Sequence, residues 1–161
     1  MFIFKFKNIL NLKMSQIFIS YEWGRRDLVC EIVNHLKASH KIWIDKDKMI
    51  PGERLHETIQ DGINNSEIVL AFVTLAYCKS RNCQLEIQYA NRVKKKIVYI
   101  VLERLGNVEA LPNGMGLLLA ENLCFNTYDP EWTKQNMDHY IGKLIDAIKN
   151  VKNDKSMFVS F

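Results

Sequence analysis

The feature that most constrains the fold is a series of short apolar runs separated by amphipathic segments. The clearest run is Ile68–Val73, in which no side chain is polar. Four other runs share its β-branched and aromatic character: residues 17–20, 41–44, 97–102 and 123–125. Short runs of this kind are typical of strands in a parallel sheet that is buried on both faces. The sequence therefore predicts five parallel strands.

The segments between these runs have helical spacing. Apolar residues recur three or four positions apart in three segments: Leu28, Ile32 and Leu36; Leu55, Ile59 and Ile63; and Ile141, Leu144, Ile145 and Ile148. Alternating strands and helices, joined by right-handed crossovers, place helices on both faces of one open sheet. We therefore expect an α/β fold.

Length and composition indicate one domain. The chain has 161 residues, of which 48% are hydrophobic, and a net charge of +4. We expect a domain over residues 15–149, a disordered leader over 1–14 and a tail over 150–161. Phenylalanines alternate with lysines in the leader, so a basic amphipathic anchor is the alternative there, and Met14 is a second possible start. No run approaches the ~20 apolar residues of a membrane span.

Charge and cysteine spacing argue against several classes of site. The basic residues are scattered, so nucleic acid is not an expected partner. The one dense run, Lys94 to Lys96, is interpreted as complementing a helix dipole, with a phosphate-contact patch as the alternative. The four cysteines form no C-x-x-C pair, so we expect no metal site. Reduced thiols favour a cytoplasmic location.

Glu86 is the most informative charged residue. Ser80 predicts a helix N-cap, and Cys83, Ile87 and Ala90 then form an apolar stripe that also contains Glu86. A carboxylate in such a stripe is either functional or hydrogen-bonded to a neighbouring loop. With the strand order 2-1-3-4-5, ligands bind between the first and third strands, at their carboxyl ends. Those strands end at Ser20-Tyr21 and Val73-Thr74.

Other nucleotide motifs are absent from the sequence. Gly114-Met-Gly116 resembles the start of a dinucleotide fingerprint, but Leu119 stands at the third glycine position and no strand precedes it. No Walker lysine motif or catalytic triad signature is present. A flavodoxin-like receiver domain needs clustered acidic residues after the first strand to bind Mg2+. Only Glu22 and Asp27 lie there.

Taken in order, three stretches make the chain resemble the TIR (Toll/interleukin receptor) domain family. They are Ile17-Phe-Ile-Ser-Tyr21, Trp43-Ile-Asp45 followed by Gly52-Glu53, and Ser80 to Glu86. The resemblance implies a flavodoxin-like five-stranded parallel sheet in the order 2-1-3-4-5. It also implies assembly with other TIR domains through the loop from Asp45 to Arg54, the BB loop, with these interface residues: Met49, Ile50, Pro51, Gly52 and Glu53.

The family has two functional branches. One recruits other TIR domains as a signalling scaffold, and the other, when assembled, cleaves NAD+ to nicotinamide and ADP-ribose or a cyclic product in immune or stress signalling. By resemblance, Glu86 is the catalytic residue of the second branch. The expected NAD+ contacts are Ser20, Tyr21, Trp23, Asp45, Thr74 and Asn82. NAD+ is then a substrate, and no prosthetic group is expected.

One position departs from the family pattern. Many members carry Trp four residues before this glutamate, where this chain has Asn82. NAD+ cleavage is the leading expectation, because nicotinamide leaves as a neutral molecule and one carboxylate can stabilise the developing oxocarbenium ion. A non-catalytic TIR adaptor is the alternative.

Overall fold

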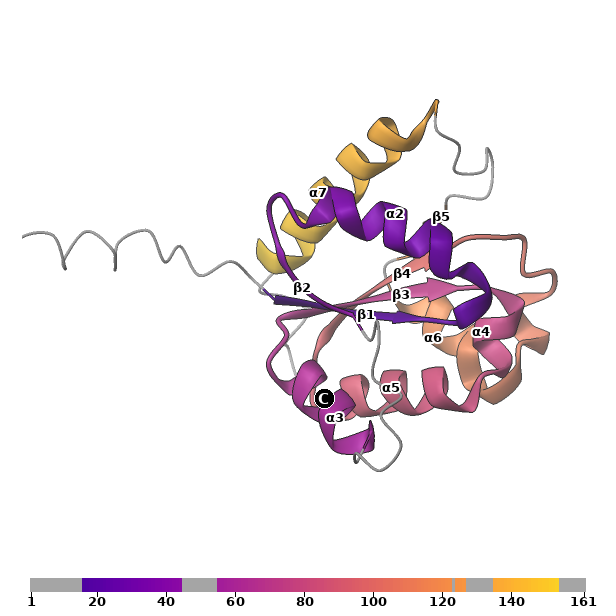
Figure 1. Ribbon diagram of the computed structural model, residues 1–161. Coiled ribbons are helices and arrows are strands. Elements are labelled where there is room, and N and C mark those ends of the chain that lie inside the picture. The colour runs from indigo at the N-terminus through magenta and orange to yellow at the C-terminus, as the bar shows by residue number, and fades with distance from the viewer. Residues whose placement is uncertain (1–15, 45–54, 123, 127–134, 154–161) are drawn as a thin grey trace, which may run out of the picture.

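The computed structural model describes residues 16–44, 55–122, 124–126 and 135–153. Five parallel strands form one sheet in the order β2-β1-β3-β4-β5 (Figure 1). Their bounds are Gln16–Tyr21 for β1, Lys41–Ile44 for β2, Ile68–Val73 for β3, Lys96–Val101 for β4 and Cys124–Asn126 for β5. The predicted flavodoxin-like sheet and its strand order are confirmed. The first, fourth and fifth strands each differ from the predicted bounds by one residue at each end.

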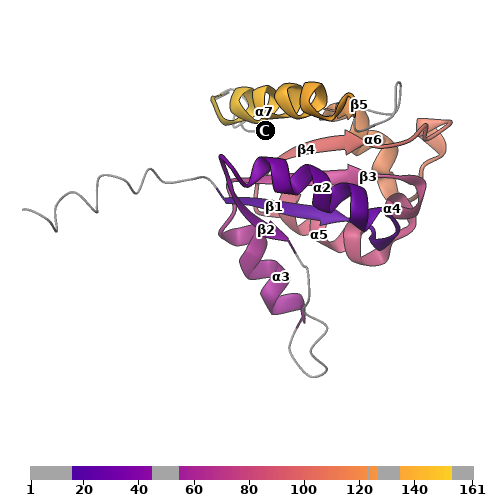
Figure 2. The same cartoon turned by 45° about the horizontal axis from the view of Figure 1, so that its top comes forward.

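Helices cover both faces of the sheet. Helices α2 and α7 lie on one face, and α3 and α5 lie on the other (Figures 1 and 2). The bounds of the α-helices are Arg26–Leu36 for α2, Leu55–Asn64 for α3, Leu75–Lys79 for α4, Arg81–Arg92 for α5, Met115–Glu121 for α6 and Met137–Asn153 for α7. Three 3-10 turns complete the described elements: η1 at Trp23–Arg25, η2 at Val108–Ala110 and η3 at Pro112–Gly114.

The sheet divides the core into two hydrophobic clusters. Ile17, Ile19 and Tyr21 of β1 pack with α2 and α7, whereas Phe18 packs with residues of α3 and α5. This division follows from the alternation of side chains along a strand. It also sends the side chain of Ser20 to the α5 side of the sheet, and this direction decides the geometry of the site.

Side-chain caps fix the starts of two consecutive helices at the carboxyl end of β3. The Thr74 hydroxyl accepts a hydrogen bond from the backbone N–H of Tyr77, which begins α4. The Ser80 hydroxyl accepts from the backbone N–H of Cys83, which begins α5. The predicted N-cap at Ser80 is therefore confirmed. Helix α4 was not predicted, because five residues are too few to show a helical period.

The last helix is longer than expected. Helix α7 continues to Asn153, and Val151 is buried against the sheet. The predicted boundary between domain and tail at residue 150 therefore falls inside α7. The predicted leader at residues 1–14 lies outside the described residues. In the part of the chain that the structure describes, no helix is both long enough and apolar enough to cross a membrane.

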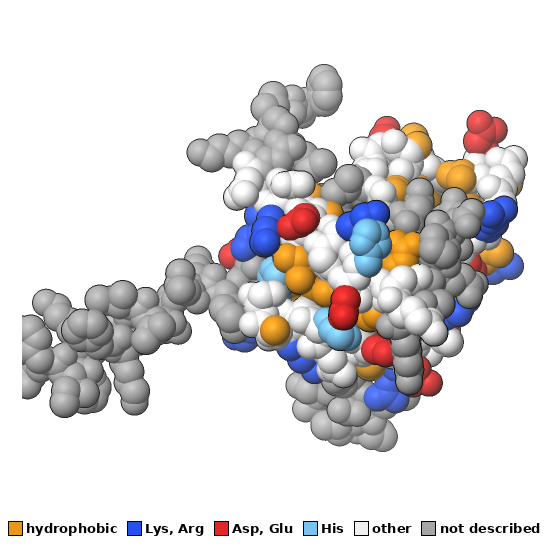
Figure 3. All heavy atoms as spheres, turned by 90° about the horizontal axis from the view of Figure 1, so that it is seen from above, with side chains coloured by type: hydrophobic (Ala, Val, Ile, Leu, Met, Phe, Trp, Pro, Cys, Tyr) orange, Lys and Arg blue, Asp and Glu red, His pale blue; other side chains and the backbone are white. Residues whose placement is uncertain are grey.

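The Lys94–Lys96 run binds the ends of helices other than its own. The Lys95 ammonium donates to the backbone carbonyls of Asn64 and Ser66, each at 2.7 Å, at the end of α3. The Lys96 ammonium donates to the carbonyl of Val151 at 2.6 Å, near the end of α7. The run was interpreted as complementing the dipole of the helix that it follows, α5, whereas the hydrogen bonds of Lys95 and Lys96 lead to the carboxyl ends of α3 and α7. On the α2 and α7 face, acidic and basic side chains are interspersed (Figure 3).

Candidate active site

The site is built around the carboxylate of Glu86, which lies beside the carboxyl end of β1. Glu86 is half-buried on α5, on the same side of the helix as the buried Cys83, Ile87 and Ala90. The Ser20 hydroxyl donates a hydrogen bond to Glu86 Oε2 at 2.5 Å. Such a short bond is typical of a hydroxyl paired with a charged carboxylate. The structure thus brings two of the predicted site residues together at the predicted edge of the sheet.

Tyr77 extends this contact into the core. Its phenolic oxygen lies 2.7 Å from Ser20 Oγ, and its side chain is fully buried. Burial raises the pKa of Tyr77 well above 10, and the nearby Cys83 and Glu86 raise it further. The phenol therefore remains protonated at neutral pH. Tyr77, Ser20 and Glu86 form a continuous hydrogen-bonded chain, hereafter the Tyr77–Ser20–Glu86 chain.

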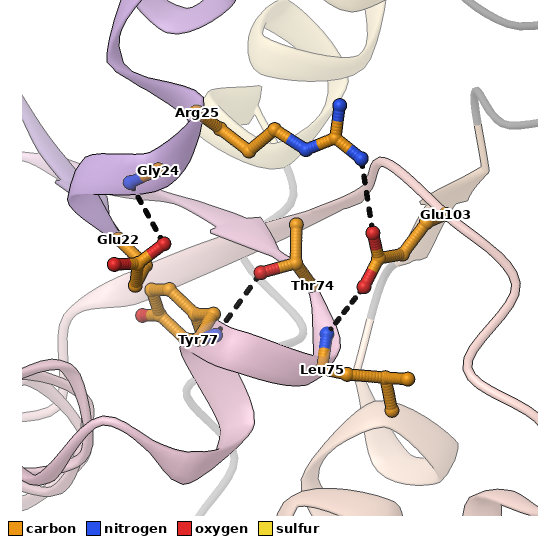
Figure 4. Close-up of polar contacts among 7 residues, drawn as sticks. All are labelled: Glu22, Gly24, Arg25, Thr74, Leu75, Tyr77 and Glu103. Atoms are coloured by element: carbon orange, nitrogen blue, oxygen red, sulfur yellow. Dashed lines mark hydrogen bonds and ion pairs between the residues drawn. The ribbon is translucent and has the colours of Figure 1, made fainter.

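A second polar cluster lies where β3 meets α4 (Figure 4). Glu103, just after β4, accepts from the backbone N–H of Leu75 at 2.7 Å and from the Arg25 guanidinium at 3.0 Å. The carboxylate thereby binds the first N–H of α4, where negative charge is favourable. The Arg25–Glu103 ion pair joins the segments that follow β1 and β4 across the carboxyl end of β3.

Thr74 lies within this cluster. Its side chain is buried and caps α4 through the backbone N–H of Tyr77. A hydroxyl has one proton and two acceptor lone pairs, so the cap leaves the Thr74 proton for another acceptor. In this structure Thr74 orients Tyr77, and a direct contact to a nucleotide stays a prediction.

Tyr21, the last residue of β1, and Trp23, just after it, occupy different environments. The ring of Tyr21 packs in the cluster against α2 and α7, on the face of the sheet opposite to α5, and its backbone carbonyl accepts from the Cys83 thiol. Tyr21 was expected beside Glu86, and the alternation along β1 instead turns its ring away. Trp23 is 53% exposed, and the Arg26 guanidinium lies 5.5 Å from its ring centroid. Trp23 is therefore the more accessible of the two rings for stacking.

Asn82 is the remaining predicted contact that the structure describes. Asn82 is exposed on α5, one turn before Glu86. Asp45 and the predicted interface residues Met49, Ile50, Pro51, Gly52 and Glu53 lie outside the described residues.

The thiols close to the site are poor nucleophiles. Burial raises the pKa of Cys83 to about 12 and that of Cys78 to about 11. Both thiols are therefore protonated at neutral pH, and the thiolate is the reactive form. Among the described residues, no group of three or more His, Cys, Asp or Glu side chains is placed to hold a metal ion. Among the groups described here, the carboxylate of Glu86 is therefore the best candidate for a catalytic group.

The family model that matches this sequence is that of the TIR domain, over residues 17–140. This match covers most of the chain. The protein belongs to the TIR-domain family. No curated protein matches the sequence.

Solved structures show the same fold as this TIR domain at low sequence identity. The TIR domain of the Toll-related receptor TRR-2 from Hydra magnipapillata has a TM-score of 0.62 and 18% identity, covering 85% of this chain and 98% of that one. The TIR domains of the activated Roq1 resistosome, which recognises the pathogen effector XopQ, give 0.61 and 13%, covering 83% and 99%. The CMP N-glycosidase BcmB from Clostridium botulinum gives 0.50 and 15%, covering 81% and 98%.

Three site residues of this TIR domain were not found from the sequence: Tyr77, Arg25 and Glu103. The signal for Tyr77 was Thr74 at the end of a buried strand with Tyr three residues later, because that spacing matches an N-cap and its N3 residue. Glu103 follows a buried strand and Leu102 directly, but its partners are far away in the sequence. Contacts between the ends of different strands leave no local pattern.

Proposed function

We propose that this TIR domain cleaves the nicotinamide–ribose bond of NAD+, with Glu86 as the catalytic carboxylate. The observation that carries the proposal is the 2.5 Å hydrogen bond from Ser20 to Glu86 at the carboxyl end of β1. This edge of the sheet is where open α/β folds bind nucleotides, at the reversal of strand order between β1 and β3. A preorganised charge at that edge suits a reaction in which positive charge develops on a ribose.

The chemistry needs one carboxylate and no general acid. The bond between ribose C1′ and the pyridinium nitrogen breaks, and its electron pair neutralises the pyridinium, so nicotinamide leaves uncharged. The ribosyl group becomes an oxocarbenium ion, which Glu86 stabilises electrostatically. Water then adds to C1′ and loses one proton to solvent, which gives ADP-ribose. An adenine nitrogen attacking instead of water gives a cyclic product. Both routes balance without a prosthetic group or metal.

The described residues supply further contacts for NAD+. Trp23 is exposed beside Arg26 and can stack on a base, and Asn82 lies one turn from Glu86 where its amide can reach a ribose or nicotinamide. By family resemblance we also include Ser20, Tyr21 and Thr74 in the proposed NAD+ site, together with Asp45, which lies outside the described residues. The likeness to the fold of a CMP N-glycosidase supports the reaction class, because that protein also acts on an N-glycosidic bond of a nucleotide.

The experiment is a nicotinamide-release assay on concentrated protein, since the proposal includes activity in the self-assembled state. Chromatography follows the nicotinamide released from NAD+. Wild-type protein should release nicotinamide, and Glu86→Ala should not. Circular dichroism and thermal melting of both proteins serve as controls for folding. Release by Glu86→Ala at the wild-type rate would remove Glu86 from the mechanism.

A non-catalytic adaptor is the second candidate. The observation in its favour is that the hydrogen bond from the buried Ser20 gives Glu86 a structural role without a substrate, because it ties α5 to β1. In that case the protein acts by TIR–TIR association, with residues Met49 to Glu53 as the proposed interface. Asn82→Trp separates the two candidates. An enzyme weakened by the loss of an aromatic should gain nicotinamide release, and an adaptor should release none in either form.

A further inference from the structure

The direction of the hydrogen bonds behind Glu86 can be deduced from the protons available. Ser20 has a single hydroxyl proton and donates it to Glu86 Oε2. Ser20 Oγ therefore has only lone pairs to offer Tyr77. At 2.7 Å, the bond between the two hydroxyls must then be donated by Tyr77. The proton order is Tyr77 to Ser20 to Glu86, and every donor in it points towards the carboxylate.

The origin of this chain is rigid. The Tyr77 ring is fully buried in the cluster between the sheet and α5, and the backbone N–H of Tyr77 is held by Thr74 at 3.0 Å. Ser20 is also buried, and it pairs with Ala71 near the carboxyl end of the ladder between β1 and β3. Through Ser20, the Tyr77 phenol therefore ties the Glu86 side chain on α5 to the sheet and to α4.

We propose that Tyr77 is a positioning residue that holds the carboxylate of Glu86 in one orientation by donating to Ser20. For its catalytic consequence the proposal rests on the proposed function; the contact itself does not. Successive hydrogen bonds polarise one another, so the phenol strengthens the bond that Ser20 gives to Glu86. A carboxylate held in this way keeps its charge directed at one point, as stabilisation of a transition state requires.

The kinetic test compares Tyr77→Phe with Tyr99→Phe. Both tyrosines are fully buried, and Tyr99 lies on β4, outside the chain of hydrogen bonds to Glu86. Tyr77→Phe should lower kcat for nicotinamide release about 3- to 10-fold, the cost of one hydrogen bond, with KM unchanged. Tyr99→Phe should leave kcat unchanged. Equal effects of the two substitutions would reduce Tyr77 to a packing residue.

A double substitution shows whether Tyr77 acts through Ser20. In a Ser20→Ala background, Tyr77→Phe should cause no further loss of kcat, because the link is already broken. If Tyr77 only supported the core, Tyr77→Phe would lower kcat by the same factor in both backgrounds. Such additivity would overturn the proposal.

A spectroscopic arm tests the proposal without activity. The 13C carboxyl resonance of Glu86, assigned by comparison with Glu86→Gln, should move in the same direction in Ser20→Ala and Tyr77→Phe, and should stay in place in Tyr99→Phe. Wild-type protein that releases no nicotinamide but shows this pattern would contradict the proposed function and support the positioning role. An unchanged resonance in Tyr77→Phe would overturn the positioning role whatever the activity.

Discussion

At the residue scale, burial of His40 makes the stability of the fold depend on pH. His40, between α2 and β2, is almost fully buried. Burial lowers its pKa below 6.5, the positive charges of Lys152 and Lys149 lower it further, and the hydrogen bond to Leu36 opposes the shift. The folded state therefore favours the neutral imidazole, so His40 links stability to pH.

The sign of this link gives a prediction. The unfolded chain binds a proton on His40 more tightly than the fold does, so the stabilisation is complete above pH 6.5 and is lost as the pH falls through the lowered pKa. Urea unfolding between pH 7.5 and 5 should show a steeper acid loss in wild type than in His40→Gln. The control is His35→Gln, a change at an exposed position of α2. If His40→Gln retained the full acid loss, other groups would be responsible.

At the element scale, α3 approaches the sheet through a glycine. A β-carbon on Gly62 would lie 2.6 Å from the ring of Trp43, and that ring stacks on Phe18 with centroids 4.6 Å apart. The indole is thus packed between the helix and the strand. This contact fixes α3 against β2 directly after the segment predicted to form the assembly loop.

Gly62→Ala is accordingly expected to destabilise the fold, by about 1–3 kcal/mol, as overpacking usually does. Gly142→Ala is the matched control in α7, where a β-carbon meets nothing within 4 Å. There the substitution should stabilise by about 0.5–1 kcal/mol, because alanine is the better helix former. Free energies of unfolding in urea measure both. Equal effects at the two positions would show that the Trp43 contact yields on substitution.

The same scale shows what the sequence could and could not predict. Strand Ile68–Val73 was predictable because burial on both faces makes it a continuous apolar run, and the stripe of Cys83, Ile87 and Ala90 because burial of one helix face gives it a helical period. The placement of Glu86 followed from that stripe together with the sheet order. The direct hydrogen bonds from Ser20 to Tyr77 and Glu86 were not predictable, because those two residues are 57 and 66 positions away from Ser20. Tertiary contacts at that separation leave no periodic signal.

At the scale of the whole molecule, the two ends of the parallel strands have different roles. The carboxyl ends carry the Tyr77–Ser20–Glu86 chain, and the amino ends carry Lys95 and Lys96. The two lysines bind the last carbonyls of α3 and α7, helices on opposite faces, to the start of β4. The lysines thereby donate hydrogen bonds to carbonyl groups that have no partner within their own helices.

Lys96→Met should therefore lower the free energy of unfolding by about 0.5–2 kcal/mol, because the end of α7 loses a charged donor. Lys94→Met is the control, since Lys94 is exposed in the same run, and it should cost less. Hydrogen exchange should localise the effect of Lys96→Met to the last turn of α7. Uniformly faster exchange across the domain would instead indicate a general loss of packing.

The measurement that tests the central claim most directly is kcat for nicotinamide release by wild-type protein and by Glu86→Gln. Glutamine keeps the size of the side chain and an acceptor for Ser20 but removes the charge. Loss of one strong electrostatic contact typically costs about 10²–10³ in kcat. The account predicts a loss of that size with the thermal melting temperature almost unchanged. A Glu86→Gln variant that keeps the wild-type kcat would contradict the claim that the charge of Glu86 drives the cleavage.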